Sequence, residues 1–235
     1  MRLRVKFSKH GALRFIGHLD VMRYFQKAIR RADIDIAYSE GFSPHQIMTF
    51  AAPLGVGLES NGEYMDIEVN SLTSSKQLVD ALNEQMAEGI EVLEAKLLPD
   101  NVGNAMASVS AASYSIRFRE GFKPSFLSAQ SLNDFYSQQE IVVTKKTKRS
   151  EATFDMKPYI YELVLDDDGK TVRLTADASS AGNLKPALVM RAYYEMNGGV
   201  FDEYAFLITR EETYLNAGDA EHSKLMPLGF IGSDY

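Results

Sequence analysis

The chain has 235 residues, a formal net charge of −7 and an apolar content of 45%, which suits one large domain or two of about 100 residues each. It contains no cysteine, so disulfides, thiolate zinc sites, iron–sulfur clusters held by the chain itself and cysteine nucleophiles are excluded. The sequence shows neither a signal peptide nor a run of about 18 apolar residues, which predicts a cytoplasmic protein without membrane contact.

Basic residues are concentrated at the start of the chain. Residues 1–50 hold nine Lys and Arg against four Asp and Glu, a net charge of +5, so the rest of the chain carries −12. This division favours an anionic ligand for the first part of the chain.

Apolar periodicity predicts the elements of the first half. The expected ranges are a strand at 2–7, a helix at 19–32, an extended segment at 34–38, strands at 46–51 and 64–69, a helix at 75–88 and a strand at 90–97. In the first helix a spacing of 100° per residue places an apolar face opposite a basic face. The apolar face holds Val21, Met22, Phe25 and Ile29, and the basic face holds Arg23, Lys27, Arg30 and Arg31.

The second half repeats this order after a small, polar connector at 99–112. The expected ranges are a strand at 114–119, a helix at 124–136, strands at 140–146, 159–165 and 171–176, a helix at 184–196 and a strand at 204–209. Apart from one further strand between the helices of the second half, each half reads β-α-β-β-α-β, which predicts an α+β fold of tandem ferredoxin-like sandwiches, with antiparallel sheets covered by helices on one face. The predicted domains are residues 1–98 and 111–235.

Several segments carry a family resemblance. GALRFIGHLDVMRYFQKAIRRA, AYSEGFSPHQIMTFAAPLGVGLES and EYMD near the start, with DMKPYI and ITREETY later, resemble the radical-SAM-linked proteins. That bacterial family of unassigned function is encoded beside radical S-adenosylmethionine proteins or fused to their C-termini. The resemblance implies a stand-alone partner of such a protein, and it implies no reaction. Where the family pattern usually has a second proline after His45, this chain has Gln46.

Basic side chains are the candidate nucleic-acid contacts, because Lys and Arg neutralise phosphates and release counterions. A solvated helix surface is the alternative interpretation. The candidates are Lys9, Arg14, Arg23, Lys27, Arg30, Arg31, Lys145 and Lys146, the last two within the basic run KKTKR at 145–149.

Three histidines near the start are candidate ligands or acid–base groups, because imidazole titrates near neutrality and carboxylates orient it. They are His10, His18 and His45, with Asp20 nearby. No metal-binding spacing is present, so no metal site and no cofactor are predicted. The turn-rich segment SEGFSPH at 39–45 either presents Phe42 and His45 to a base by stacking or buries Phe42 in the core. We also expect His18 and His45 to share one concave surface with Arg14 and Arg23.

Three functions remain open. The first is a non-catalytic accessory protein that binds RNA or a ribonucleoprotein for a radical S-adenosylmethionine enzyme. The second is a His-dependent endoribonuclease, by analogy with CRISPR repeat-processing enzymes of tandem ferredoxin-like architecture. The third is a protein–protein scaffold. Because no catalytic triad or paired carboxylates stand out, the sequence favours a binding partner over an enzyme acting alone.

Overall fold

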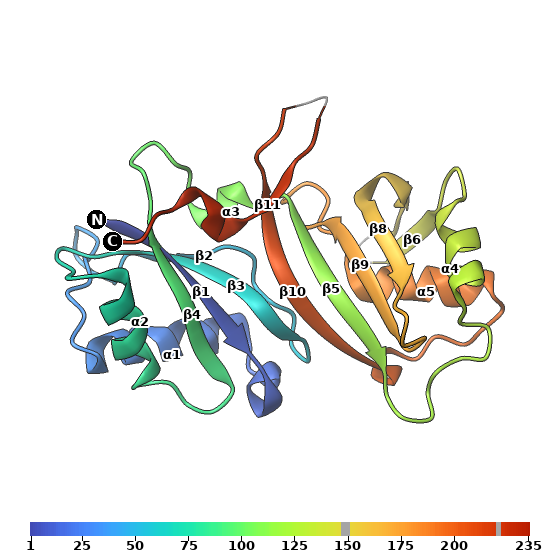
Figure 1. Cartoon of the computed structure of the whole chain (residues 1–235), viewed down its shortest axis with the longest axis horizontal. Coiled ribbons are helices and arrows are strands. Elements are labelled where there is room, and N and C mark those ends of the chain that lie inside the picture. The colour runs from blue at the N-terminus through green and yellow to red at the C-terminus, as the bar shows by residue number, and fades with distance from the viewer. Residues whose placement is uncertain (147–150, 220–221) are drawn as a thin grey trace. The chain divides into compact units, whose positions relative to one another are not determined.

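The computed structural model describes residues 1–146, 151–219 and 222–235 (Figure 1). The chain forms two compact units. Unit 1 comprises Met1–Ser110 and Arg210–Tyr235, and unit 2 comprises Ala111–Thr209. The predicted C-terminal domain at 111–235 is therefore wrong in one respect, because Arg210–Tyr235 returns to pack with unit 1.

Unit 1 is built from the β-α-β-β-α-β order that the sequence predicted. Its elements are β1 (Arg2–Lys9), the 3-10 turn η1 (Gly11–Phe15), α1 (His18–Arg31), β2 (Met48–Phe50), β3 (Glu59–Glu68), α2 (Ser75–Asn83), β4 (Ile90–Leu97), α3 (Ala105–Ser108), β11 (Leu225–Pro227) and η4 (Leu228–Ile231). Strand β10 (Phe206–Asn216) crosses the boundary between the units at Thr209.

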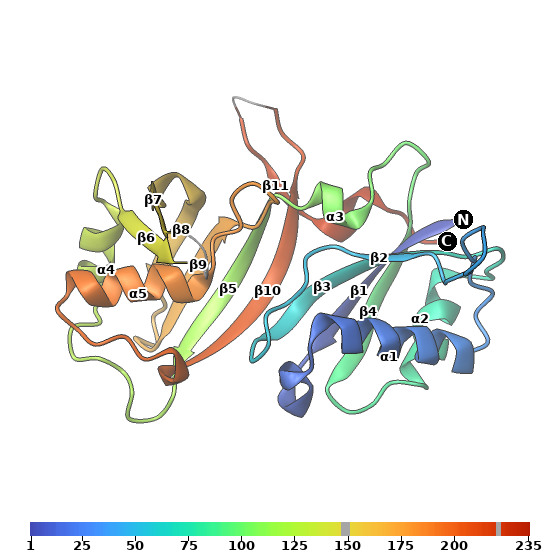
Figure 2. The same ribbon diagram turned by 180° about the vertical axis from the view of Figure 1, so that it is seen from behind.

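The sheet of unit 1 runs in the order β4-β1-β3, and both β2 and β10 pair with β3. Every registered pairing among β1 to β4 is antiparallel. One apolar cluster joins β1, β3 and β4 to both α1 and α2, and Figure 2 shows α1 in front of these strands. The helix–sheet core of unit 1 therefore lies between these strands and the two helices.

Unit 2 contains a second sheet region in the order β10-β5-β9-β8. Its elements are β5 (Ala111–Phe118), α4 (Ala129–Tyr136), β6 (Val142–Lys146), β7 (Glu151–Asp155), η2 (Lys157–Tyr159), β8 (Ile160–Leu165), β9 (Thr171–Asp177), α5 (Pro186–Met196), η3 (Glu203–Ala205) and the first residues of β10. Strands β6 and β7 form a separate antiparallel hairpin, and the sequence did not predict β7. An apolar cluster of described residues packs α4 and α5 against the strands.

The α+β prediction is confirmed. The strand order of unit 1, and the matching order β10-β5-β9-β8 in unit 2, support the tandem ferredoxin-like interpretation, which we retain as a proposal. None of the helices in the described part of the chain has the length and hydropathy of a bilayer-spanning segment.

Candidate functional site

Helix α1 is fixed to unit 1 by its apolar stripe. Val21, Phe25 and Ile29 are buried, and the ring of Phe25 lies edge-on at 4.7 Å to Phe7 of β1. Met22, which the sequence placed in the core, is only half-buried. The residue lies at the border of the stripe and packs against the same core.

The outer face of α1 is basic and exposed, as the helical spacing predicted. It presents Arg23, Lys27, Arg30 and Arg31. Two of these cations have side-chain partners. Arg23 lies 3.5 Å from Asp20 in a pair whose side chains are 66% and 62% exposed, so the attraction is screened by water. Arg31 donates to the side-chain oxygen of Gln85 at 3.4 Å and to its backbone carbonyl at 3.0 Å, and neither oxygen carries a formal negative charge.

Other basic residues at the start of the chain are neutralised inside unit 1. Arg4 is 1% exposed and forms a two-pronged ion pair with Asp66 at 2.8 and 3.0 Å. Lys6 lies 2.6 Å from Glu212 of β10. The net charge of +5 counted from residues 1–50 therefore overstates the field at the surface.

Lys9 and Arg14 are corrections to the predicted interface. Lys9 is only 2% exposed, because it follows the buried Phe7 by two residues and so points to the same sheet face. Burial lowers the pKa of the Lys9 amine, and the nearby Glu63 carboxylate partly opposes the shift. Arg14 is half-buried and lies 3.0 Å from Glu59. Neither cation is presented to a ligand as Arg23 or Lys27 is.

His18 occupies a packing position at the start of α1. Its ring lies edge-on to Phe50 at 5.1 Å, and it lines a small cavity together with Lys9 and Glu63. The cavity measures about 10 Å³, the lower limit for one water molecule. Glu63 is further held by Arg210 at 2.9 Å. This cluster serves chiefly to neutralise charges that the fold has buried.

His10 and His45 are each engaged in local contacts. The His10 ring lies 2.9 Å from the side-chain oxygen of Asn61 and 3.5 Å from Glu59. The Nδ1 atom of His45 lies 2.8 Å from the hydroxyl of Ser39, and that hydroxyl also accepts from the His45 amide at 3.1 Å. These contacts close the SEGFSPH segment into a tight loop.

Phe42 lies in this loop and is fully exposed. The alternative in which Phe42 is buried in the core is therefore wrong. The loop is closed at its base by an isolated bridge between Tyr38 and Gln46.

The predicted meeting of His18 and His45 does not occur. Ile36, in the segment before β2, bridges to Val69, and the amide of Val69 donates to the carbonyl of Met1. This segment therefore lies at the end of the sheet where β1 begins. His18 lies with Lys9, where β1 ends. Figure 2 shows the same separation, because η1 and the loop after α1 lie at opposite ends of the helix. The two histidines therefore belong to different surfaces of unit 1.

Lys145 and Lys146 end strand β6, and their side chains lie outside the described residues, as does the run 147–149. Among the described side chains, no three His, Asp or Glu residues gather closely enough to hold a metal ion.

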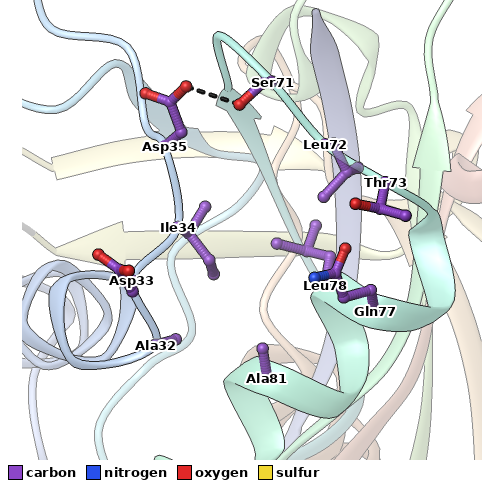
Figure 3. Close-up of a pocket in the computed structure, with 10 residues that line it drawn as sticks. All are labelled: Ala32, Asp33, Ile34, Asp35, Ser71, Leu72, Thr73, Gln77, Leu78 and Ala81. Atoms are coloured by element: carbon purple, nitrogen blue, oxygen red, sulfur yellow. Dashed lines mark hydrogen bonds between the residues drawn. The ribbon is translucent and has the colours of Figure 1, made fainter.

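A separate pocket of about 260 Å³ lies between the end of α1 and the start of α2 (Figure 3). Asp35, at its edge, accepts hydrogen bonds from Asn70 at 2.8 Å and Ser71 at 2.7 Å, and these bonds lower the pKa of its carboxyl group. None of the predicted site residues lines this pocket. Its two carboxylates, Asp33 and Asp35, would repel the anionic ligand that the basic face favours.

Three exposed apolar side chains lie in η1, in the first turn of α1 and in the loop before β3, and the sequence did not predict their exposure. Phe15, Leu19 and Val56 are 60%, 58% and 60% exposed. The amide of Gly57 donates to the carbonyl of Arg14 at 2.8 Å, which ties the loop holding Val56 to η1. We call these three side chains the apolar tip. The residue spacing around Phe15 does not distinguish an exposed ring from a buried one, and only the surface position of η1 shows that the ring is exposed.

Residues 2–186 match a family described as an uncharacterized protein conserved in bacteria (DUF2344). No curated protein matches the chain in sequence. The family match spans most of the chain, including α1, η1 and the apolar tip, and the chain belongs to the DUF2344 family of bacterial proteins.

Proposed function

We propose that the protein is a non-catalytic accessory protein that binds RNA, or the RNA of a ribonucleoprotein, through the outer face of α1 and presents it to a radical S-adenosylmethionine enzyme. The observation that carries the RNA-binding step is the exposed row of Arg23, Lys27 and Arg30. The proposal of a radical S-adenosylmethionine enzyme as the partner is based on the resemblance of the N-terminal segments to radical-SAM-linked proteins.

The spacing of these cations suits a phosphate backbone. Arg23, Lys27 and Arg30 follow one another at intervals of four and three residues, so they lie on one face of the helix. At 1.5 Å per residue the row is about 10 Å long. Exposed Lys and Arg side chains bind phosphates by releasing condensed counterions, and their affinity therefore depends on salt.

The contacts of the histidines do not favour the endoribonuclease alternative. His10 and His45 are engaged by Asn61 and Ser39, and His18 packs on Phe50. A general acid–base pair in an RNA-cleaving enzyme needs groups that reach the reacting oxygen. The scaffold alternative has no specific contact in its favour, and it is the interpretation left if RNA does not bind.

A salt titration of RNA binding tests the proposal. Fluorescence anisotropy with a labelled single-stranded RNA, between 50 and 200 mM salt, gives the slope of log affinity against log salt. The triple variant Arg23→Gln, Lys27→Gln, Arg30→Gln should flatten this slope by about 2, because each single-strand contact contributes about 0.7. The matched control replaces three exposed cations of unit 2, Arg117, Lys123 and Lys170, by Gln.

The control variant separates the effect of net charge on the salt slope from the effect of the position of the cations. Both triple variants change the net charge by the same amount, so a general electrostatic effect would alter both slopes equally. Equal slopes in the two variants, or no binding by the wild-type protein at 50 mM salt, would contradict RNA binding at α1.

The proposed binding to a radical S-adenosylmethionine enzyme is tested by a separate measurement. A radical S-adenosylmethionine protein from the same gene neighbourhood, co-expressed with the tagged chain, should co-elute with it in size-exclusion chromatography. Separate elution of the two proteins, with and without RNA, would remove this part of the proposal.

A further inference from the structure

We propose that the apolar tip is a base-stacking platform and that the RNA bound along α1 is single-stranded, with one base stacked on Phe15. This inference rests on the proposed function and specifies its ligand. Single-stranded RNA sites combine cations that follow the backbone with aromatic side chains on which unpaired bases stack.

Phe15 has the exposure that stacking requires. Its side chain is 60% exposed, and η1 contributes no buried residue to the core. An exposed aromatic ring offers an apolar face on which an unpaired base can stack.

The ring of Phe15 is held in place from one side. The guanidinium of Arg14 lies over the ring at 4.8 Å from its centroid. Arg14 is in turn fixed by Glu59 at 3.0 Å and by the backbone bond from Gly57. Although burial raises the pKa of Glu59, hydrogen bonds from Gly11, Arg14 and His10 bring it below the usual value, so the carboxylate stays charged and retains Arg14. A fixed ring loses little freedom when a base stacks on it.

The position of the tip continues the basic row. Leu19 lies four residues before Arg23, so it belongs to the same helix face as Arg23, Lys27 and Arg30. Phe15 lies in the turn that leads directly into α1. A strand whose phosphates follow the cations therefore reaches Phe15 at the N-terminal end of the helix with its next base.

An RNA duplex cannot contact both the cations of α1 and the ring of Phe15 in this way. Its phosphates would meet the cations, but its bases are stacked on one another and its grooves present only their edges. The proposal therefore commits to unpaired RNA, and the duplex serves as the comparison.

The first experiment measures affinity. Anisotropy compares a 12-nucleotide oligouridylate with a 12-base-pair RNA duplex for the wild type, Phe15→Ala and Phe230→Ala. Phe230 is the matched control, because it is 61% exposed in η4. Phe15→Ala should weaken oligouridylate binding about 5- to 150-fold, the range for one stacked base. Its salt slope and its duplex affinity should not change, and Phe230→Ala should bind both RNAs as the wild type does.

The second experiment detects the stack directly. The chain has no tryptophan, so Phe15→Trp introduces a single indole at the platform and Phe230→Trp introduces one at the control position. Oligouridylate should quench the emission of Phe15→Trp and leave that of Phe230→Trp unchanged. Duplex RNA should quench neither variant.

The outcomes separate this inference from the proposed function. If Phe15→Ala binds oligouridylate within 2-fold of the wild type, or Phe15→Trp is not quenched, while the triple Gln variant still flattens the salt slope, RNA binding stands and the stacking platform is wrong. If the wild-type protein binds neither RNA at 50 mM salt, both proposals are wrong.

Discussion

The buried pair between Arg4 and Asp66 gives the sharpest test of how unit 1 is held together. Arg4 is 1% and Asp66 is 4% exposed, and the guanidinium also donates to the carbonyl of Leu228 at 3.1 Å. Asp66 accepts from the amide of Ala105 at 2.7 Å. The pair therefore joins β1 and β3 to α3 and to the C-terminal segment.

Asp66→Ala leaves the Arg4 cation buried without a counter-charge. Breaking a buried ion pair in this way costs about 3–5 kcal/mol. With a urea dependence of about 2 kcal/mol per molar, the unfolding midpoint should fall by about 2 M. Far-UV circular dichroism in urea measures this shift, because the chain has no tryptophan to follow.

Two further variants test whether the loss of stability comes from the unpaired buried charge of Arg4. The double variant Arg4→Met, Asp66→Leu removes both charges and keeps apolar volume, so it should lose less stability than Asp66→Ala alone. Asp20→Ala breaks the exposed contact with Arg23 and should cost less than about 1 kcal/mol. A loss below about 1 kcal/mol for Asp66→Ala, or a larger loss in the double variant, would refute the reasoning.

Three further predictions concern packing and ionisation. Phe25→Ala should cost about 3–5 kcal/mol through the cavity it creates, whereas Arg30→Ala should stay within about 0.5 kcal/mol; equal losses in urea unfolding would show that α1 is oriented wrongly. Gly62→Ala should cost about 1–3 kcal/mol, because its Cβ would lie 2.6 Å from the Cα of Glu212; an unchanged urea midpoint would exclude this close approach. Tyr194→Phe should raise the free energy of unfolding by about 1 kcal/mol, because the buried hydroxyl has no hydrogen-bond partner among the described residues. Burial raises the pKa of Tyr194 to about 12, above the unfolded value of about 10, so wild-type stability should fall between these two pH values, and fall less in the Phe variant.

The sequence by itself determined the local elements of the fold. A strand predicted at 90–97 is β4 at Ile90–Leu97, and a helix predicted at 19–32 is α1 at His18–Arg31. Both follow from side-chain periodicity, which depends only on neighbouring residues. The same periodicity correctly placed Arg23, Lys27 and Arg30 on the exposed face of α1.

Only the tertiary structure decided which charged groups remain available. Lys9 is buried beside Glu63, and Glu63 is paired with Arg210, which lies 147 residues later in the chain. The return of β10 to β3 also moved Arg210–Tyr235 into unit 1. The periodicity of a segment predicts which of its side chains share a face, but it does not predict which distant strand will cover that face. The packing of distant segments decides which charged groups are buried or paired and whether Phe15 is exposed. These properties therefore follow only from the folded structure.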